Sequence, residues 1–174
     1  MTSTRWTTTI PATLLGTAAI VAGSSLIAAG AGSAHAEPSP GGESRNAQVV
    51  REAFATGVGA PDTFYAILAD EVTWTVARAD TPATYTGRQH FLDSGAQPVV
   101  DRLTGQIDAE VHEMVADGGR VVARWRGTAT ALDGQPYVNE YNWVMTMADD
   151  RVTHVVAYLD FVALDALLHR VPLR

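Results

Sequence analysis

The chain has 174 residues, of which 47% are hydrophobic and 18% are charged, and its formal net charge is −7. This length suits one domain with a single core and a short extension. There is no cysteine, and all 12 basic residues are arginine, which excludes disulfides, thiolate nucleophiles, zinc-thiolate sites and Schiff-base chemistry. An acidic chain without an arginine-rich block is poorly suited to nucleic acid, so we expect no nucleic-acid partner.

Residues 1–36 are expected to be a secretory signal peptide. They carry one charged residue, and a long uncharged run is followed by Ala34-His35-Ala36, which has small residues at both positions that a signal peptidase reads. We expect secretion, with cleavage between Ala36 and Glu37. The alternative is a retained membrane anchor, because the run approaches the ~20 apolar residues that cross a bilayer. Its glycine, serine and threonine content favours removal, which leaves no stable membrane span.

Residues 37–45 are rich in proline, glycine and serine, which predicts a flexible linker to one domain over residues 46–174. The spacing of apolar residues predicts a helix over Asn46–Thr56 and a second, short helix over Pro61–Leu68. The domain is therefore expected to begin with helices.

Alternating apolar and polar residues predict a first strand over Val72–Val76, followed by a loop. A third helix is expected over Arg88–Leu103, although Gly95 and Pro98 weaken it in the middle.

The rest of the chain reads as strands joined by tight turns, one of them at Asp149-Asp150, and a closing helix over Val162–His169. Consecutive strands joined by tight turns pair antiparallel, so the element order is that of an α+β domain. The four strands are expected at about Ile107–Ala116, Val121–Leu132, Tyr137–Met147 and Val152–Leu159.

The final hairpin, residues 141–160, resembles the last two strands of SnoaL-like proteins, with Tyr158 followed two residues later by Asp160. Residues Leu68 to Val72, which lead into a strand that contains Trp74, resemble the corresponding segment of the same family. The chain thus resembles the SnoaL-like and ketosteroid-isomerase-like domains of the nuclear-transport-factor-2-like superfamily. This resemblance implies a cone-shaped, curved, mostly antiparallel sheet wrapped around N-terminal helices.

The resemblance also identifies the positions where family members carry their proton-transfer groups. The isomerase base lies two residues past the position of Trp74, where this chain has Val76. In the cyclases the acid lies one residue before the aromatic residue that matches Tyr158, and this chain has Ala157 at that position. The histidine that partners the acid in the cyclases would fall near Trp143. Loss of the general base lowers the rate of such a reaction by a factor of about 10²–10⁴, so the family's usual mechanism is not expected here.

What remains at those positions is an apolar, aromatic lining suited to a small hydrophobic molecule. The alternative is that these side chains are simply core. Strand alternation and the resemblance together predict a ligand pocket formed by Trp74, Val76, Trp125, Tyr141, Trp143, Val155 and Ala157.

The polar residues offer only weak catalytic candidates, namely His90, Asp93, His112, His154 and Asp160. The histidines lack the spacing of metal ligands, so we expect neither a metal nor another cofactor. Asp160 has the alternative role of capping the helix that follows it. Asn142 falls near the oxyanion-donor position of isomerases, whereas alternation turns it away from the Trp143 face, and these two inferences are incompatible.

Three functions are consistent with the sequence. The favoured one is a secreted domain that binds a small hydrophobic ligand without converting it. The alternative is an isomerase, cyclase or hydrolase that acts on a polyketide- or steroid-like substrate through relocated acid–base residues. The third is a homodimeric interaction module that uses the exposed sheet face, where Arg124 and Arg126 are expected near Glu110, His112 and Glu140.

Overall fold

The structure is a computed structural model and describes residues 44–173, so the predicted signal peptide and most of the predicted linker lie outside the described residues. Among the residues it describes, no helix combines the length and the apolar character that a membrane crossing requires. The elements in chain order are α1 (Arg45–Phe54), the 3₁₀ turn η1 (Phe64–Ile67), β1 (Leu68–Val76), β2 (Ala83–Thr86), α2 (Arg88–Phe91), the π turn η2 (Leu92–Ala96), α3 (Gln97–Val100), β3 (Asp108–Asp117), β4 (Arg120–Thr130), β5 (Pro136–Ala148), β6 (Arg151–Leu159) and α4 (Phe161–Arg170).

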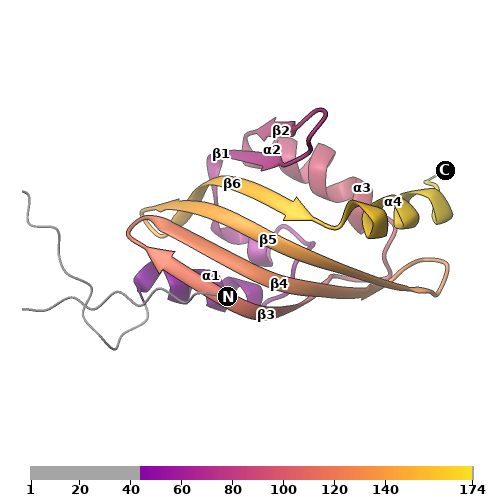
Figure 1. The fold of residues 1–174 in the computed structure, drawn as a ribbon, viewed down its shortest axis with the longest axis horizontal. Helices are drawn as coiled ribbons and strands as arrows, with labels where there is room; N and C mark the ends of the chain where they lie inside the picture. The colour runs from indigo at the N-terminus through magenta and orange to yellow at the C-terminus, as the bar shows by residue number, and fades with distance from the viewer. Residues whose placement is uncertain (1–43, 174) are drawn as a thin grey trace, which may run out of the picture. The chain divides into compact units, whose positions relative to one another are not determined.

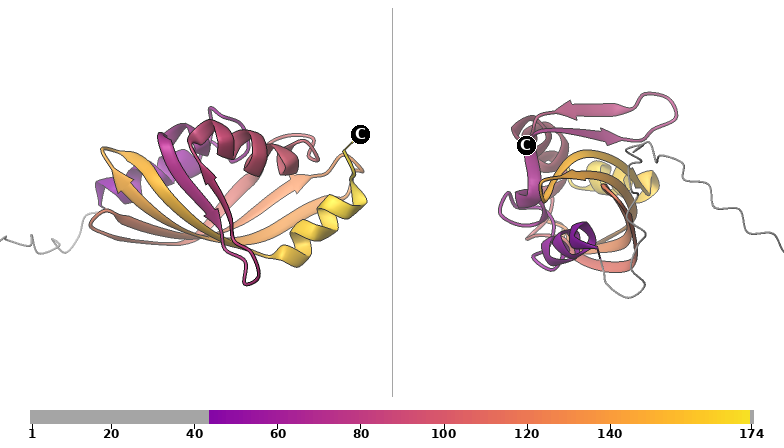
Figure 2. Two further views of the ribbon diagram at one scale, coloured as in Figure 1. Left: turned by 90° about the horizontal axis from the view of Figure 1, so that it is seen from above. Right: turned by 90° about the vertical axis from the view of Figure 1, so that its left-hand side faces the viewer.

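The six strands form one mixed sheet in the order β2-β1-β6-β5-β4-β3. Every neighbouring pair is antiparallel except β1 and β6, which run parallel. The sheet is curved, with α1 and the α2–α3 segment on its concave side (Figures 1 and 2). A register shift between Val111 and Glu113 in β3 marks a β-bulge, which bends a strand and increases its twist.

The first predicted helix is confirmed as α1, and Ser44 is its N-cap. The Ser44 hydroxyl accepts a hydrogen bond from the backbone N–H of Ala47 at 3.2 Å, which satisfies one of the free donors of the first turn. The helix buries Val49, Val50 and Phe54 and packs against β3 and β4. It therefore covers one end of the concave face.

The helix predicted over Pro61–Leu68 is wrong, because the structure has only the short 3₁₀ turn η1 there. The backbone N–H of Phe64 donates to the carbonyl of Gly57 at 3.0 Å, so the chain folds back before a helix can extend. Leu68 already belongs to β1, where it pairs with Val152 of β6. The aromatic side chains of η1 are buried in the core instead of forming a helical stripe.

The loop predicted after the first strand contains the short edge strand β2. It pairs antiparallel with β1, and the hydroxyls of Thr75 and Thr84 lie 3.1 Å apart. The helix predicted over Arg88–Leu103 ends at Val100 and is interrupted by the π turn η2. The interruption contains Gly95, whose missing Cβ would lie 2.9 Å from the Phe91 ring.

The predicted turn at Asp149 and Asp150 is confirmed. Both residues adopt left-handed backbone angles, with φ of 50° and 59°, as a two-residue hairpin turn of type I′ requires. The closing helix is also present as α4, which follows β6 directly and lies beyond the end of the β6 arrow (Figure 1).

Gly127 on β4 provides a test of how tightly the interior is packed. A Cβ at this position would lie 2.7 Å from Ile107 Cγ2, 2.9 Å from Tyr141 Cε2 and 3.0 Å from Trp125 Cζ3. We expect Gly127→Ala to lower the free energy of unfolding by about 1–3 kcal/mol, as overpacked cores do. Gly105→Ala, where nothing lies within 4 Å of the added Cβ, is the matched control. Urea unfolding of both variants measures the difference, and equal midpoints would show that the interior yields easily.

Candidate functional site

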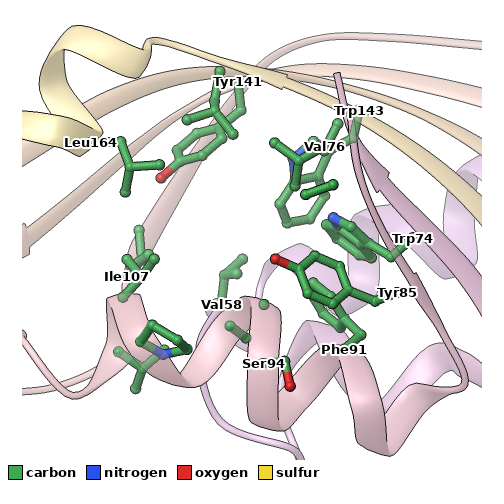
Figure 3. Close-up of a pocket in the computed structure, with 18 of the residues that line it drawn as sticks. Val58, Trp74, Val76, Tyr85, Phe91, Ser94, Ile107, Tyr141, Trp143 and Leu164 are labelled. Carbon is green, nitrogen blue, oxygen red and sulfur yellow. The ribbon is translucent and has the colours of Figure 1, made fainter. Parts of the chain in front are cut away.

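A cavity of about 230 Å³ opens between the concave face of the sheet and the helices. Side chains from β1, β5 and β6 form one wall, the α2–α3 segment forms the opposite wall, and α4 contributes Leu164 and Leu168. Figure 3 shows Tyr141 and Trp143 reaching into this space from the sheet, with Phe91 and Tyr85 on the other side. The cavity therefore lies at the centre of the fold.

The structure brings six of the seven predicted pocket residues to this cavity. Val155 does not line it; this residue lies in the core and pairs with Trp74 and Met145 in the sheet register. The six that line it are Trp74, Val76, Trp125, Tyr141, Trp143 and Ala157.

The aromatic rings of the wall hold one another in place. Trp125 stacks on Tyr141 with centroids 4.1 Å apart, and Trp74 stacks on Phe91 at 4.0 Å. Trp143 meets both tryptophans edge-on, at 4.9 Å from Trp74 and 4.7 Å from Trp125. Because stacked and edge-to-face pairs gain energy beyond simple burial, these rings resist collapsing into the cavity.

A buried hydrogen-bond chain, Asn139–Tyr137–Tyr141, ends at the cavity. Asn139 Nδ2 donates to the Tyr137 hydroxyl at 3.0 Å, and the hydroxyls of Tyr137 and Tyr141 lie 2.9 Å apart. The two hydroxyls carry two protons and share one between them, so one O–H stays available whichever of them donates. Both tyrosines line the cavity, and beyond their mutual contact neither hydroxyl donates to another acceptor in the hydrogen bonds of residues 44–173.

Burial raises the pKa of three cavity tyrosines. Desolvation is the largest cause for Tyr65, Tyr137 and Tyr141, because a phenolate is poorly solvated away from water. These groups therefore remain neutral at physiological pH. A neutral phenol can donate a hydrogen bond, whereas it is a weak base.

Arg78 is the only charged side chain among the described residues that line the cavity, which include no carboxylate and no imidazole. Its guanidinium carbon lies 4.6 Å from the centroid of the Phe161 ring. Its Nε is 3.6 Å from Asp80 Oδ1. The electrostatic character of the cavity is thus set by hydroxyl dipoles and by one cation at its edge.

All five weak catalytic candidates lie outside the cavity lining. His90, His112 and His154 are exposed. The carboxylate of Asp93 accepts a hydrogen bond from the neighbouring Gln89 at 2.8 Å. The carboxylate of Asp160 accepts from the backbone N–H groups of Val162 and Ala163, so the helix-cap role is confirmed. Within residues 44–173, no cluster of histidine and acidic side chains has the arrangement of a metal site.

Asn142 lies on the outer face of the sheet, so the alternation argument is right and the position inferred from the resemblance is wrong. Asn142 lines a shallow outer groove, and no hydrogen-bond partner within residues 44–173 reaches its buried Oδ1. On the same face Arg126 pairs with Glu140 at 2.6 Å, as expected, and Arg124 lies 3.5 Å from Glu113. The homodimer through this face stays a prediction.

Sequence reasoning missed four residues that shape the site. Tyr137 and Asn139 follow from the same alternation that placed Tyr141 and Trp143, since residues two apart share a strand face. Tyr65 and Tyr85 come from η1 and β2, neither of which was predicted. No local signal would have placed these two at the cavity.

Comparisons with known proteins agree on one architecture. A family model described as a SnoaL-like domain matches residues 47–155. The structure of TerC co-crystallised with polyporic acid has a TM-score of 0.59 and 21% identity, and the match covers 72% of this chain and 99% of that chain. The search of curated proteins gave no match.

Two further solved structures have the same fold. One is a protein from Jannaschia sp. CCS1, provisionally named a SnoaL-like polyketide cyclase, with a TM-score of 0.57, 18% identity, and coverage of 72% of this chain and 96% of that chain. The other is a nuclear-transport-factor-2-like protein of unknown function from Burkholderia pseudomallei, with a TM-score of 0.55, 18% identity, and coverage of 75% and 100%. Identities this low show the fold alone, a curved mixed sheet with helices.

The raised pKa values of the buried tyrosines predict a loss of stability in alkali. A tyrosine whose pKa is higher in the folded state than its ordinary value of 10.0 keeps its proton longer when folded. The contribution of these tyrosines to the free energy of unfolding should therefore be constant below about pH 10 and fall as the pH rises above it. Neither lysine nor cysteine titrates in this range, because the chain has none.

Urea unfolding between pH 8 and pH 11 measures this effect, with Tyr65→Phe as the test and Tyr158→Phe as the control. Tyr65 is 6% exposed and Tyr158 is 50% exposed, so only the first substitution should flatten the alkaline decline. Identical alkaline slopes in both variants would contradict the assignment of the effect to the buried hydroxyl.

Proposed function

The chain belongs to the SnoaL-like domain family, and we propose that it binds one small, flat, oxygen-bearing aromatic molecule in its cavity without converting it. One observation carries the proposal: the Tyr137–Tyr141 pair keeps an unshared O–H inside a wall of aromatic rings. The neighbouring side chains supply a surface for a ring, and the hydroxyl supplies one directional contact. Such a combination of apolar walls and few polar groups is typical of small-molecule sites.

The size of the cavity limits the ligand. Its 230 Å³ is below the roughly 300–1,000 Å³ of sites that enclose drug-sized molecules. One ring or two fused rings suit this space better than a four-ring steroid or polyketide. Burial of such a ligand contributes about 25 cal/mol per Å² of apolar surface removed from water.

The unshared proton favours a ligand with an acceptor oxygen, such as a ketone or quinone. In a dry, low-dielectric site this hydrogen bond is stronger than in water, and the donation from Asn139 through Tyr137 polarises it further. The fold shared with TerC, whose structure contains polyporic acid, supports the choice of a small organic ligand but does not identify it.

Catalysis of proton transfer is disfavoured by the lining. A general base must lie within about 2.6–3.2 Å of the proton that it removes, and the five candidate acid–base residues lie outside the lining. The neutral tyrosines can donate a hydrogen bond to an oxygen, but they cannot take up a proton. Binding without conversion therefore accounts for the site better than an isomerase, cyclase or hydrolase does.

We further propose that the protein is exported and works outside the cell that makes it. The support is the sequence of residues 1–36, which lie outside the described residues. Expression of the whole chain in a secreting bacterial host should give a mature protein that begins at Glu37, and intact mass spectrometry of the medium measures its mass. Full-length chain recovered only from the membrane fraction would favour the anchor instead.

The binding proposal is tested with naphthoquinone and with naphthalene, which has a similar shape but no oxygen. We expect naphthoquinone to bind more tightly, and the double change Tyr137→Phe with Tyr141→Phe, which removes both hydroxyls of the pair, to weaken its binding by roughly threefold to tenfold, the usual contribution of one hydrogen bond. Naphthalene should bind the wild-type protein and the variant equally. Isothermal titration calorimetry gives the dissociation constants, and the lack of cysteine prevents addition of thiols to the quinone.

Tyr158→Phe is the matched control, because Tyr158 is exposed on the outer face. It should leave both affinities unchanged. No measurable binding of either compound to the wild-type protein, or the same loss of affinity in both variants, would contradict the proposed site.

A further inference from the structure

The position of Arg78 relative to the tyrosines follows from the sheet register. Trp74 and Val76 project into the cavity from β1, and alternation places residue 78 on the same face. The backbone N–H of Ala77 donates to the carbonyl of Ala157 at 2.9 Å, so the parallel pairing with β6 continues past the end of β1. Because Val76 pairs with Ala157, Arg78 lies opposite Leu159, two residues further along each strand.

Leu159 pairs in turn with Tyr141 on β5. Arg78 and Tyr141 thus lie on one row across the sheet, two strand spacings apart, or about 10 Å between their backbones. Both line the same cavity. A ligand with one or two rings is long enough to reach the hydroxyl with one end and the guanidinium with the other.

The guanidinium of Arg78 has N–H groups available to donate to a ligand. Its ion pair with Asp80 is long, at 3.6 Å, and the Asp80 side chain is 76% exposed. The Phe161 ring lies against the guanidinium, which is a favourable cation–π contact and orients its plane. The carboxylate of Asp160, the residue before Phe161, accepts hydrogen bonds from the first turn of α4, and Asp160 lines the outer groove instead of the cavity.

We propose that the ligand is an anion, a small aromatic carboxylate whose acid group lies against Arg78 while its ring occupies the cavity. This inference rests on the proposed function and adds the charge of the ligand to it. A carboxylate can take two parallel hydrogen bonds from a guanidinium, and such charge-assisted pairs are stronger than neutral ones. The chain as a whole is acidic, so the preference for an anion comes from this local cation.

The experiment compares naphthoate with naphthamide, which has the same shape and no charge. Wild-type protein should bind naphthoate roughly tenfold more tightly than naphthamide, a ratio that one charge-assisted hydrogen bond can produce. Isothermal titration calorimetry measures both affinities. Arg78→Gln should abolish this ratio, and an unfolding midpoint in urea equal to that of the wild-type protein shows that the variant is folded. Asp80→Asn, which removes the competing carboxylate, should tighten naphthoate binding without affecting naphthamide.

Arg124→Gln is the matched control, because Arg124 is an exposed arginine on the outer sheet face, and it should keep the full preference. Equal binding of the two compounds to wild-type protein, or a preference that survives Arg78→Gln, would overturn the inference while the proposed function stands. If naphthoate, naphthamide and naphthoquinone all fail to bind, the proposed function fails, and the inference fails with it.

Discussion

One buried amide connects the fold to the site. Asn139 is 1% exposed; its Oδ1 accepts from the Asp160 N–H at 2.9 Å, and its Nδ2 donates to the Asp160 carbonyl and to the Tyr137 hydroxyl. A buried amide is costly unless its polar atoms are paired. These contacts therefore fix the junction between β6 and α4 and the position of the Tyr137 hydroxyl together. Movement of α4 would disturb the donor that faces the cavity.

The cavity persists because its walls are made of large, mutually packed rings. Protein interiors normally close around voids, but the stacked pairs Trp125–Tyr141 and Trp74–Phe91 hold each other at fixed positions, with Trp143 edge-on between them. The resulting space has an apolar surface, a neutral hydroxyl donor and a cation at one edge. It provides attraction and orientation for a ligand, and the described residues that line it include no carboxylate or imidazole to accept a proton.

Much of the fold was predictable because it depends on local patterns. The N-terminal helix and the Asp149-Asp150 turn follow from apolar spacing and turn chemistry, and alternation placed Trp143 correctly in the wall and Asn142 on the opposite face. The prediction failed where distant partners decide the structure. Strand β2 has four residues and depends on pairing with β1. The cavity positions of Tyr65 and Tyr85 follow from elements that no local pattern indicated.

The most direct test of the central claim, that an available tyrosine hydroxyl faces an apolar aromatic cavity, is the crystal structure of the protein with naphthoquinone. We predict one quinone oxygen within about 2.5–3.0 Å of the Tyr141 or Tyr137 hydroxyl, with the ring between the aromatic walls and the Asn139 contacts intact. A cavity filled by its own side chains, or a bound quinone that makes no contact with either hydroxyl, would contradict the account.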